Sequence, residues 1–164
     1  MCAMWTIGVQ ADPALTLVRD GQPEALIVTP AVPSSSAGIA AQLLSDTLFQ
    51  MSGARPKIVR ENLLNGAKVE AGRVVATGAD AAPTYILVGE GSLTKELGVT
   101  SEALGPGGIR IKTCANALVL LGADARTPTD PYGTRHAVMT LLDETLGCKY
   151  LWPTESGLVI PARK

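Results

Sequence analysis

Aromatic residues are scarce in this sequence, and charge of one sign does not dominate it. Phe, Trp and Tyr make up 4% of the 164 residues, so a folded core must be built mainly from aliphatic side chains. The chain has 14 Lys and Arg against 15 Asp and Glu, a net charge of −1. Non-specific binding to nucleic acid needs many clustered basic residues, and no long basic run is present. The sequence therefore argues against a nucleic-acid partner.

Cysteine and histidine are also few. Cys2, Cys114 and Cys148 cannot close a disulfide framework, and no two of them form a C-x-x-C pair. We expect Cys114 and Cys148 to be buried free thiols, since unpaired cysteine is among the most buried residue types. His136 is the only histidine and there is no H-E-x-x-H motif, so the usual zinc-ligand sets are missing. The sequence predicts no metal site and no cofactor.

Long apolar runs are absent as well. No stretch approaches the 18 or more apolar residues of a membrane span, so we expect none. Residues 1–10 lack the basic stretch and apolar core of an intact signal peptide, which leaves the location of the protein open. The length fits one domain, and 46% hydrophobic residues are enough to build a core. We expect a disordered or extended segment over residues 1–13 and a single α/β domain over residues 14–161.

The first half of the chain alternates strand and helix signals. Residues 15–18 and 25–28 are β-type runs around a turn cluster at residues 20–23, which predicts a hairpin. Hydroxyl caps at residues 34–36 precede apolar residues at helical spacing, and Gly53 stands where a left-handed stop belongs. Beyond this helix, we expect a strand at residues 57–59 and a small hairpin over residues 68–75.

The second half carries the clearer patterns. Residues 84–88 form a nearly continuous apolar strand, typical of a sheet covered on both faces, and residues 89–92 open a short helix. Alternation over residues 109–121 predicts a hairpin. Asp130 and Pro131 then start a last helix that ends at Gly147, and an apolar exit strand follows around Tyr150. These elements predict an α+β fold, a mixed β-sheet sandwich with two long helices.

Several residue groups could carry chemistry, and each also has a plain structural explanation. The run Gly89-Glu90-Gly91-Ser92-Leu93-Thr94 lies where a phosphate loop would, but its third glycine is missing, which favours a simple turn. Asp143 and Glu144 are adjacent and point about 100° apart on a helix, which favours a solvated face over a catalytic pair. His136 has no nearby nucleophile motif, which favours a packed or surface histidine over a catalytic base.

The loop before the last helix holds the richest polar cluster, and polar loops often bind ligands. Capping and surface charge are the competing explanation. The aromatic pair near residue 150 could stack on a sugar ring, although burial or packing against another domain is favoured. We expect ligand or interface contacts, if any, at Asp124, Arg126, Asp130, Tyr132, Arg135, His136, Tyr150 and Trp152, and predict no catalytic residue.

Read together, four segments resemble the N-terminal domain of family 20 and family 67 glycoside hydrolases, as found in bacterial hexosaminidases and α-glucuronidases. They are the helix ending Met51-Ser52-Gly53-Ala54, the strand Ile86-Leu87-Val88-Gly89, the hairpin of residues 108–121 ending in Gly122, and the C-terminal run Gly133-Thr134…Ala137-Val138…Leu142-Asp143-Glu144…Leu146-Gly147-Cys148-Lys149-Tyr150-Leu151-Trp152-Pro153…Val159-Ile160-Pro161. The resemblance covers about residues 14–161. His136 stands where that family more often has Tyr, and the loop over residues 127–132 is longer.

The resemblance implies a small α/β sandwich of zincin-like shape without a metal site. It also implies that the chain is a non-catalytic accessory domain, with a downstream (β/α)8 domain as its partner and carbohydrate as the substrate class of the parent protein. In such proteins catalysis belongs to the barrel, so no catalytic residue is carried over. Two alternatives remain open: a free-standing module that binds a saccharide or a protein, and a small hydrolase that uses His136.

Overall fold

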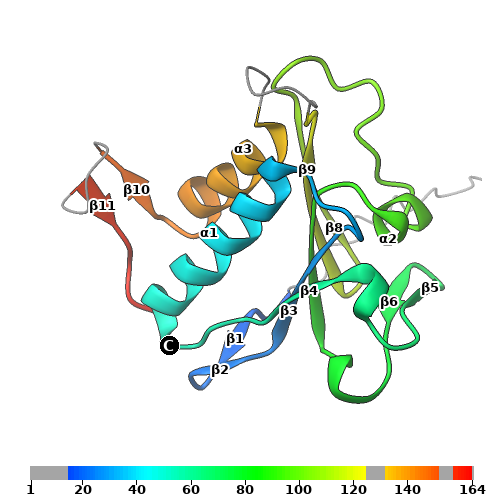
Figure 1. Ribbon diagram of the computed structural model, residues 1–164. Helices are drawn as coiled ribbons and strands as arrows, with labels where there is room; N and C mark the ends of the chain where they lie inside the picture. The colour runs from blue at the N-terminus through cyan, green and yellow to red at the C-terminus, as the bar shows by residue number, and fades with distance from the viewer. Residues whose placement is uncertain (1–14, 125–131, 152–156, 164) are drawn as a thin grey trace, which may run out of the picture.

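The computed structural model describes residues 15–124, 132–151 and 157–163, which form one mixed sheet covered on both faces (Figure 1). The segment expected to be disordered or extended, residues 1–13, lies outside the described residues. The sheet has five strands in the order β4-β3-β7-β9-β8. Their bounds are Ile58–Arg60, Ala25–Thr29, Thr84–Val88, Ala117–Gly122 and Ile109–Cys114. This mixed sheet and its helices confirm the predicted α+β sandwich.

Strand direction explains the residue pattern. β4, β3, β7 and β9 are parallel, and only β8 runs antiparallel, to its hairpin partner β9. Every residue of β3, β7 and β9 is buried, as expected for central strands with a layer on each side. The residues of β8 are half-buried or exposed because β8 is an edge strand. The predicted interior strand at residues 84–88 and the hairpin over residues 109–121 are therefore confirmed.

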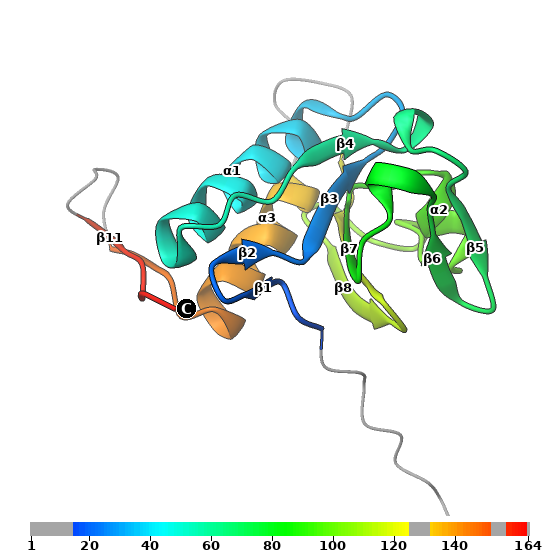
Figure 2. The same cartoon turned by 90° about the horizontal axis from the view of Figure 1, so that it is seen from below.

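Two long helices cover one face of the sheet (Figure 2). α1 spans Ser35–Ser52, and α3 spans Gly133–Thr140 and continues into a π-helical turn, η3, over Leu141–Thr145. Leu44 and Leu48 of α1 and Val138 and Leu142 of the α3–η3 segment are buried in one aliphatic cluster with the sheet. The core beneath these helices is therefore built from aliphatic side chains, as the low aromatic content predicts. Within the described residues, no helix is long and apolar enough to cross a membrane.

The other face is covered by shorter elements. They are the hairpin β5 (Lys68–Glu70) and β6 (Arg73–Val75), the turns η1 (Glu61–Leu63) and η2 (Gly78–Asp80), and the short helix α2 (Ser92–Glu96). The buried side chain of Asn116 fastens the β5–β6 hairpin to the sheet, since it accepts from the Val74 N–H and donates to the Val74 carbonyl, both at 2.9 Å. The predicted small hairpin and short helix are both confirmed.

The local helix signals act as the sequence indicates. The Ser34 side chain caps α1 by accepting from the Ala37 N–H at 3.0 Å. Gly53 ends α1 at φ +77°, and Gly147 follows η3 at φ +78°, a left-handed conformation that favours glycine. The predicted N-cap Asp130 lies outside the described residues. The N-cap position of α3 is Tyr132, whose side chain makes no capping bond. Asp124, just after β9, serves the first turn instead by accepting from the Thr134 N–H at 2.8 Å.

The hairpin predicted between residues 15–18 and 25–28 is wrong, because these two segments do not pair with each other. The turn at residues 20–21 exists, but it joins β1 (Val18–Arg19) to β2 (Gln22–Pro23). The run at residues 25–28 belongs to β3 and lies in the central sheet between β4 and β7. It is buried on both faces, and a two-stranded hairpin at the surface could not cover such a strand.

The exit strand is expected to be buried or to pack against another domain. Burial within this domain is wrong for the part of the strand that the structure describes, and packing against another domain stays a prediction. β10 (Lys149–Tyr150) and β11 (Leu158–Val159) pair as a separate hairpin that stands beside α1, away from the sheet (Figure 1). Tyr150, Leu151 and Val159 are 39%, 60% and 49% exposed, because no second layer of described residues covers this hairpin. Cys148, just before it, is a buried free thiol as expected, whereas Cys114 is only half-buried.

Candidate functional site

Five of the residues expected to make functional contacts are described by the structure. Tyr132, Arg135 and His136 lie at the start of α3, Asp124 follows β9, and Tyr150 is in β10. Arg126, Asp130 and Trp152 lie outside the described residues. Three of these residues form one group, and His136 and Asp124 each have separate surroundings.

Tyr132, Arg135 and Tyr150 form this group. The Arg135 guanidinium carbon lies 5.8 Å from the centroid of the Tyr132 ring, within the range of a cation–π contact. Partial burial raises the pKa of the Tyr150 hydroxyl, while a hydrogen bond with Thr47 and the charge of Arg135 act in the opposite direction. Arg135 therefore contacts the exposed Tyr132 ring, and its charge also acts on the exposed Tyr150 hydroxyl. Such a surface can stack on a flat ligand or pack against a partner.

His136 does not belong to a catalytic arrangement among the described residues. Its side chain is exposed, and no described hydroxyl or carboxylate hydrogen-bonds its ring. A histidine base needs a nucleophile within hydrogen-bond reach and a third group that orients the ring. The described groups around His136 supply neither.

Asp124 forms a structural junction. One carboxylate oxygen accepts from the Ser34 hydroxyl at 2.6 Å, and the other accepts from the Thr134 N–H at 2.8 Å. Ser34 in turn caps α1, so this one carboxylate joins the end of β9 to the first turns of both long helices. Both of its oxygens are occupied, and its main role is to hold the helices in place.

The N–H groups at the glycine-rich turn after β7 are hydrogen-bonded to a carboxylate of the chain itself, that of Glu61. The Glu61 carboxylate accepts from the Ser92 N–H at 2.9 Å and from the Ala31 N–H at 3.3 Å, and it also reaches the Leu93 N–H. A Cβ on Gly91 would lie 2.5 Å from this carboxylate. Glu61 thus occupies the N-terminus of α2, the position in which a phosphate loop would hold its phosphate. This geometry favours the simple turn. No sequence pattern predicts this role for Glu61, because Glu61 lies 31 residues from Ser92.

A small hollow of about 240 Å³ lies where β3, β7 and β9 end, the edge at which open parallel sheets usually bind ligands. Its polar lining includes Ser34, Asp124, Glu90 and Ser101. Burial alone would raise the pKa of Glu90, but hydrogen bonds from Ser101 and the charge of Lys95 lower it overall. The Glu90 carboxylate accepts from the Ser101 N–H at 2.6 Å. The polar groups of this hollow are therefore satisfied within the protein.

Two further features concern the end of α3. Burial raises the pKa of the Cys148 thiol, and Asp143 adds to this while Arg163 acts against it. The thiol is thus protonated at neutral pH and is a poor nucleophile.

Asp143 forms an ion pair with Lys149 rather than acting with Glu144. Within the described ranges, no three His, Cys, Asp or Glu side chains are close enough together to hold a metal ion.

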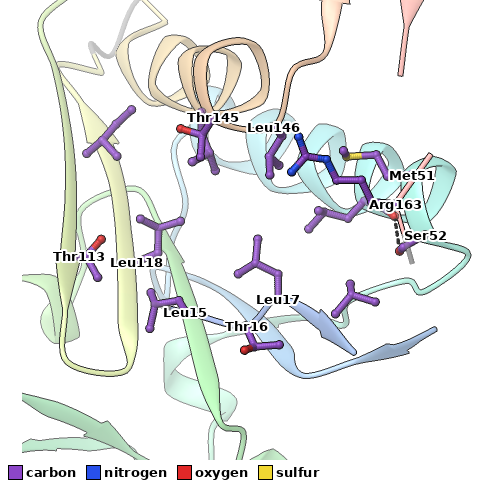
Figure 3. A pocket seen from close by; sticks show the side chains of 14 residues that line it. Leu15, Thr16, Leu17, Met51, Ser52, Thr113, Leu118, Thr145, Leu146 and Arg163 are labelled. Atoms are coloured by element: carbon purple, nitrogen blue, oxygen red, sulfur yellow. Dashed lines mark hydrogen bonds between the residues drawn. The ribbon is translucent and has the colours of Figure 1, made fainter. Parts of the chain in front are cut away.

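A mostly apolar groove lies at the other end of the sheet, between the helices and the β8–β9 hairpin (Figure 3). This groove has a volume of about 550 Å³. Five segments far apart in the sequence line it: residues 15–18, the end of α1, β8–β9, the end of α3–η3, and Arg163. No motif marks it in the sequence, because each segment contributes only a few apolar side chains.

Comparison with known proteins does not extend these observations. A scan against protein-family models and a search of the curated proteins give no match to this chain.

Proposed function

We propose that this chain is a non-catalytic accessory domain of a glycoside-hydrolase-like protein, and that it packs against a catalytic (β/α)8 domain. The observation that carries the proposal is the exposed apolar surface of the β10–β11 hairpin. Tyr150 in β10, Leu151 just after it, and Val159 in β11 are each at least 39% exposed on a hairpin that stands away from the sheet. The register places Leu151 and Val159 on one face of the hairpin and Tyr150 on the other. Clustered exposed apolar side chains mark interaction sites in folded proteins.

The sequence resemblance adds the identity of the partner. The exposed residues fall within the C-terminal run that resembles the family, where the chain of such proteins continues toward the barrel. The zincin-like shape implied by the resemblance is part of the same proposal. In this arrangement, the tyrosine–arginine surface of Tyr132, Arg135 and Tyr150 would border the contact and shape one rim of a carbohydrate cleft.

The polar groups of the domain fit an accessory role. The carboxylates of Asp124 and Glu61 cap helices, and that of Glu90 accepts from the Ser101 N–H. Carboxylates that perform glycoside hydrolysis must instead face a substrate in pairs. These three carboxylates are engaged in holding the domain together, which supports a structural role for them. We assign hydrolysis to the partner domain.

The test begins with the gene. We expect the reading frame to continue beyond Lys164 into a barrel with paired carboxylates. In that full-length protein, Leu151→Ser should lower the unfolding temperature and the glycosidase activity, because it removes apolar area from the domain contact. Val32→Ser is the matched control, since Val32 is 89% exposed but lies on the loop before α1.

Two results would count against the proposal. A reading frame that ends at Lys164 would remove the partner. In a longer protein, equal unfolding temperatures and activities for Leu151→Ser and Val32→Ser would show that the β10–β11 hairpin does not form the contact.

A second candidate function is a free-standing saccharide-binding module. The observation in its favour is a hollow of about 280 Å³ lined by Tyr150, Met139, Thr140, Asp143 and Glu144. An exposed aromatic ring beside carboxylates and a hydroxyl can stack on a sugar and hydrogen-bond its hydroxyl groups. Calorimetric titration with chitin and glucuronoxylan oligosaccharides tests this function. Binding that is lost in Tyr150→Ala but kept in Tyr132→Ala would support it, and no heat of binding would exclude it for these sugars.

A further inference from the structure

The apolar groove lies beside the C-terminal ends of α1 and η3. Its lining has the composition of a ligand site rather than of an ordinary surface hollow. Of its 14 lining residues, nine carry apolar side chains, four carry hydroxyl groups, and only Arg163 is charged. Leu17 and Leu118 contribute to its floor, and Met51 and Leu146 line the helical side (Figure 3). Its volume of about 550 Å³ lies within the range of small-molecule sites, which are mostly apolar with a few polar groups.

Arg163 is held at one rim of this groove. Its backbone N–H donates to the Met51 carbonyl at 2.8 Å, which fixes the root of the side chain at the end of α1. The side chain lies between Leu146 and Met51, opposite Thr113 (Figure 3). Among the described residues, no carboxylate forms an ion pair with it. A single cation at the edge of an apolar groove complements a ligand with one anionic end.

We propose that this groove binds a single-chain amphiphile with a carboxylate head, the class that includes medium-chain fatty acids. The carboxylate would pair with the Arg163 guanidinium at the rim, and the alkyl chain would lie along Met51, Leu17 and Leu118 toward β8. This site is independent of the proposed accessory function, because the β10–β11 hairpin contributes no residue to it.

The two parts of the ligand contribute in ways that can be separated. Each methylene group that enters an apolar site should raise the affinity about fourfold, until the groove is filled. The carboxylate pair is partly exposed to water, so its contribution should be about fivefold. An alcohol of the same chain length should therefore bind about fivefold more weakly than the carboxylate.

The experiment measures displacement of anilinonaphthalene sulfonate fluorescence from the chain by hexanoate, octanoate, decanoate and dodecanoate, each below its micelle concentration. We expect affinity to rise with chain length. Arg163→Gln should weaken decanoate binding about fivefold and leave decanol binding unchanged. Arg73→Gln, at an exposed arginine in β6 on the other face of the sheet, is the matched control and should change neither.

A second variant tests the groove itself. Ile111 is 38% exposed on the edge strand β8 and lines the groove. The larger side chain of Ile111→Trp should fill the groove, and tryptophan is also a residue that strands favour. We expect it to abolish binding of every chain length, with an unchanged circular dichroism spectrum showing that it folds. Two outcomes would overturn the proposal. One is no displacement by any carboxylate, which would show that the groove does not bind this class of ligand. The other is equal decanoate binding by the parent chain and Arg163→Gln.

Discussion

The carboxylate of Asp124 accepts a hydrogen bond from the hydroxyl of Ser34 at 2.6 Å, across 90 residues of sequence. The same carboxylate accepts from the first turn of α3, and the same hydroxyl accepts from the first turn of α1. The unpaired N–H groups at the starts of two helices are thus served by one linked pair of side chains. This contact sets the two long helices side by side on one face of the sheet.

Replacing Asp124 should therefore weaken both helix starts. We expect Asp124→Ala to lower the free energy of unfolding by about 2 kcal/mol, because it removes a helix cap and a charge-assisted hydrogen bond. Urea denaturation followed by circular dichroism measures the change. Glu144→Ala, at an exposed carboxylate on η3, is the control and should cost less than about 0.5 kcal/mol. Equal losses for the two variants would show that the junction contributes little.

The close approach of β9 and α3 depends on a pair of glycines. A Cβ on Gly122 would lie 2.6 Å from the Cα of Gly133, a backbone atom that cannot move aside. We expect Gly122→Ala to lower the free energy of unfolding by about 3 kcal/mol, through overpacking.

Gly38 provides the opposite case in the same chain. It lies within α1, and a Cβ there would meet no atom within 4 Å. Gly38→Ala should raise the free energy of unfolding by about 0.5–1 kcal/mol, since alanine is the better helix former. A thermal melt of both variants tests the pair. A stable Gly122→Ala variant would contradict the packing argument.

The Glu61 carboxylate should matter more than its place on a surface turn suggests. It satisfies N–H groups of Ser92, Leu93 and Ala31. Glu61→Ala should lower the free energy of unfolding by about 1–2 kcal/mol, and Glu61→Gln by less, because the amide retains one acceptor oxygen. Hydrogen exchange measures the protection of the Ser92 amide, which should fall when the Glu61 carboxylate is removed. Unchanged protection of that amide in Glu61→Ala would contradict the assigned cap.

Asp80 should make the free energy of unfolding depend on pH in the acidic range. Hydrogen bonds from Asn65, and then Lys57, hold the pKa of its carboxyl below the ordinary value of 3.8. A lowered folded-state pKa stabilises the protein above pH 3.8, and this stability is lost as the pH falls through the folded value. Asp80→Asn should therefore lose less stability than the parent chain over that acidic range. Urea midpoints measured across the range test this. Parallel curves for the two proteins would contradict it.

His136 should be dispensable. Its side chain is exposed and is not bonded to a described carboxylate, so His136→Ala should change the free energy of unfolding by less than about 0.5 kcal/mol. Any hydrolysis of aryl glycosides or esters by the chain should also be unchanged. A loss of activity in His136→Ala with an intact fold would favour the small-hydrolase alternative.

Local signals explain what could be predicted. The apolar spacing of α1, its Ser34 cap and the Gly53 stop all lie within about 20 residues, and each depends on short-range geometry. The continuous apolar run of β7 and the alternation of β8 likewise record whether a strand is covered on one face or two. These patterns were sufficient for the α+β class and for most element positions.

Contacts between distant segments explain what could not be predicted. Residues 25–28 form a strand, as expected, but only their burial among β4 and β7 selects those strands as partners instead of residues 15–18. The caps by Asp124 and Glu61 join loops 10 and 31 residues from the helix starts, with no periodic signal. Tyr150 is exposed because its hairpin stands away from the sheet, which its apolar neighbours in sequence did not indicate.

The sequence alone therefore determined the kinds of element, their caps and stops, and an aliphatic core, because these follow from properties of neighbouring residues. Only the tertiary structure decided the strand order, the Asp124–Ser34 junction, the exposed hairpin and the groove beside Arg163. Each of these depends on which distant segments come together, and that is set by the joint burial of all the strands and helices rather than by any one of them.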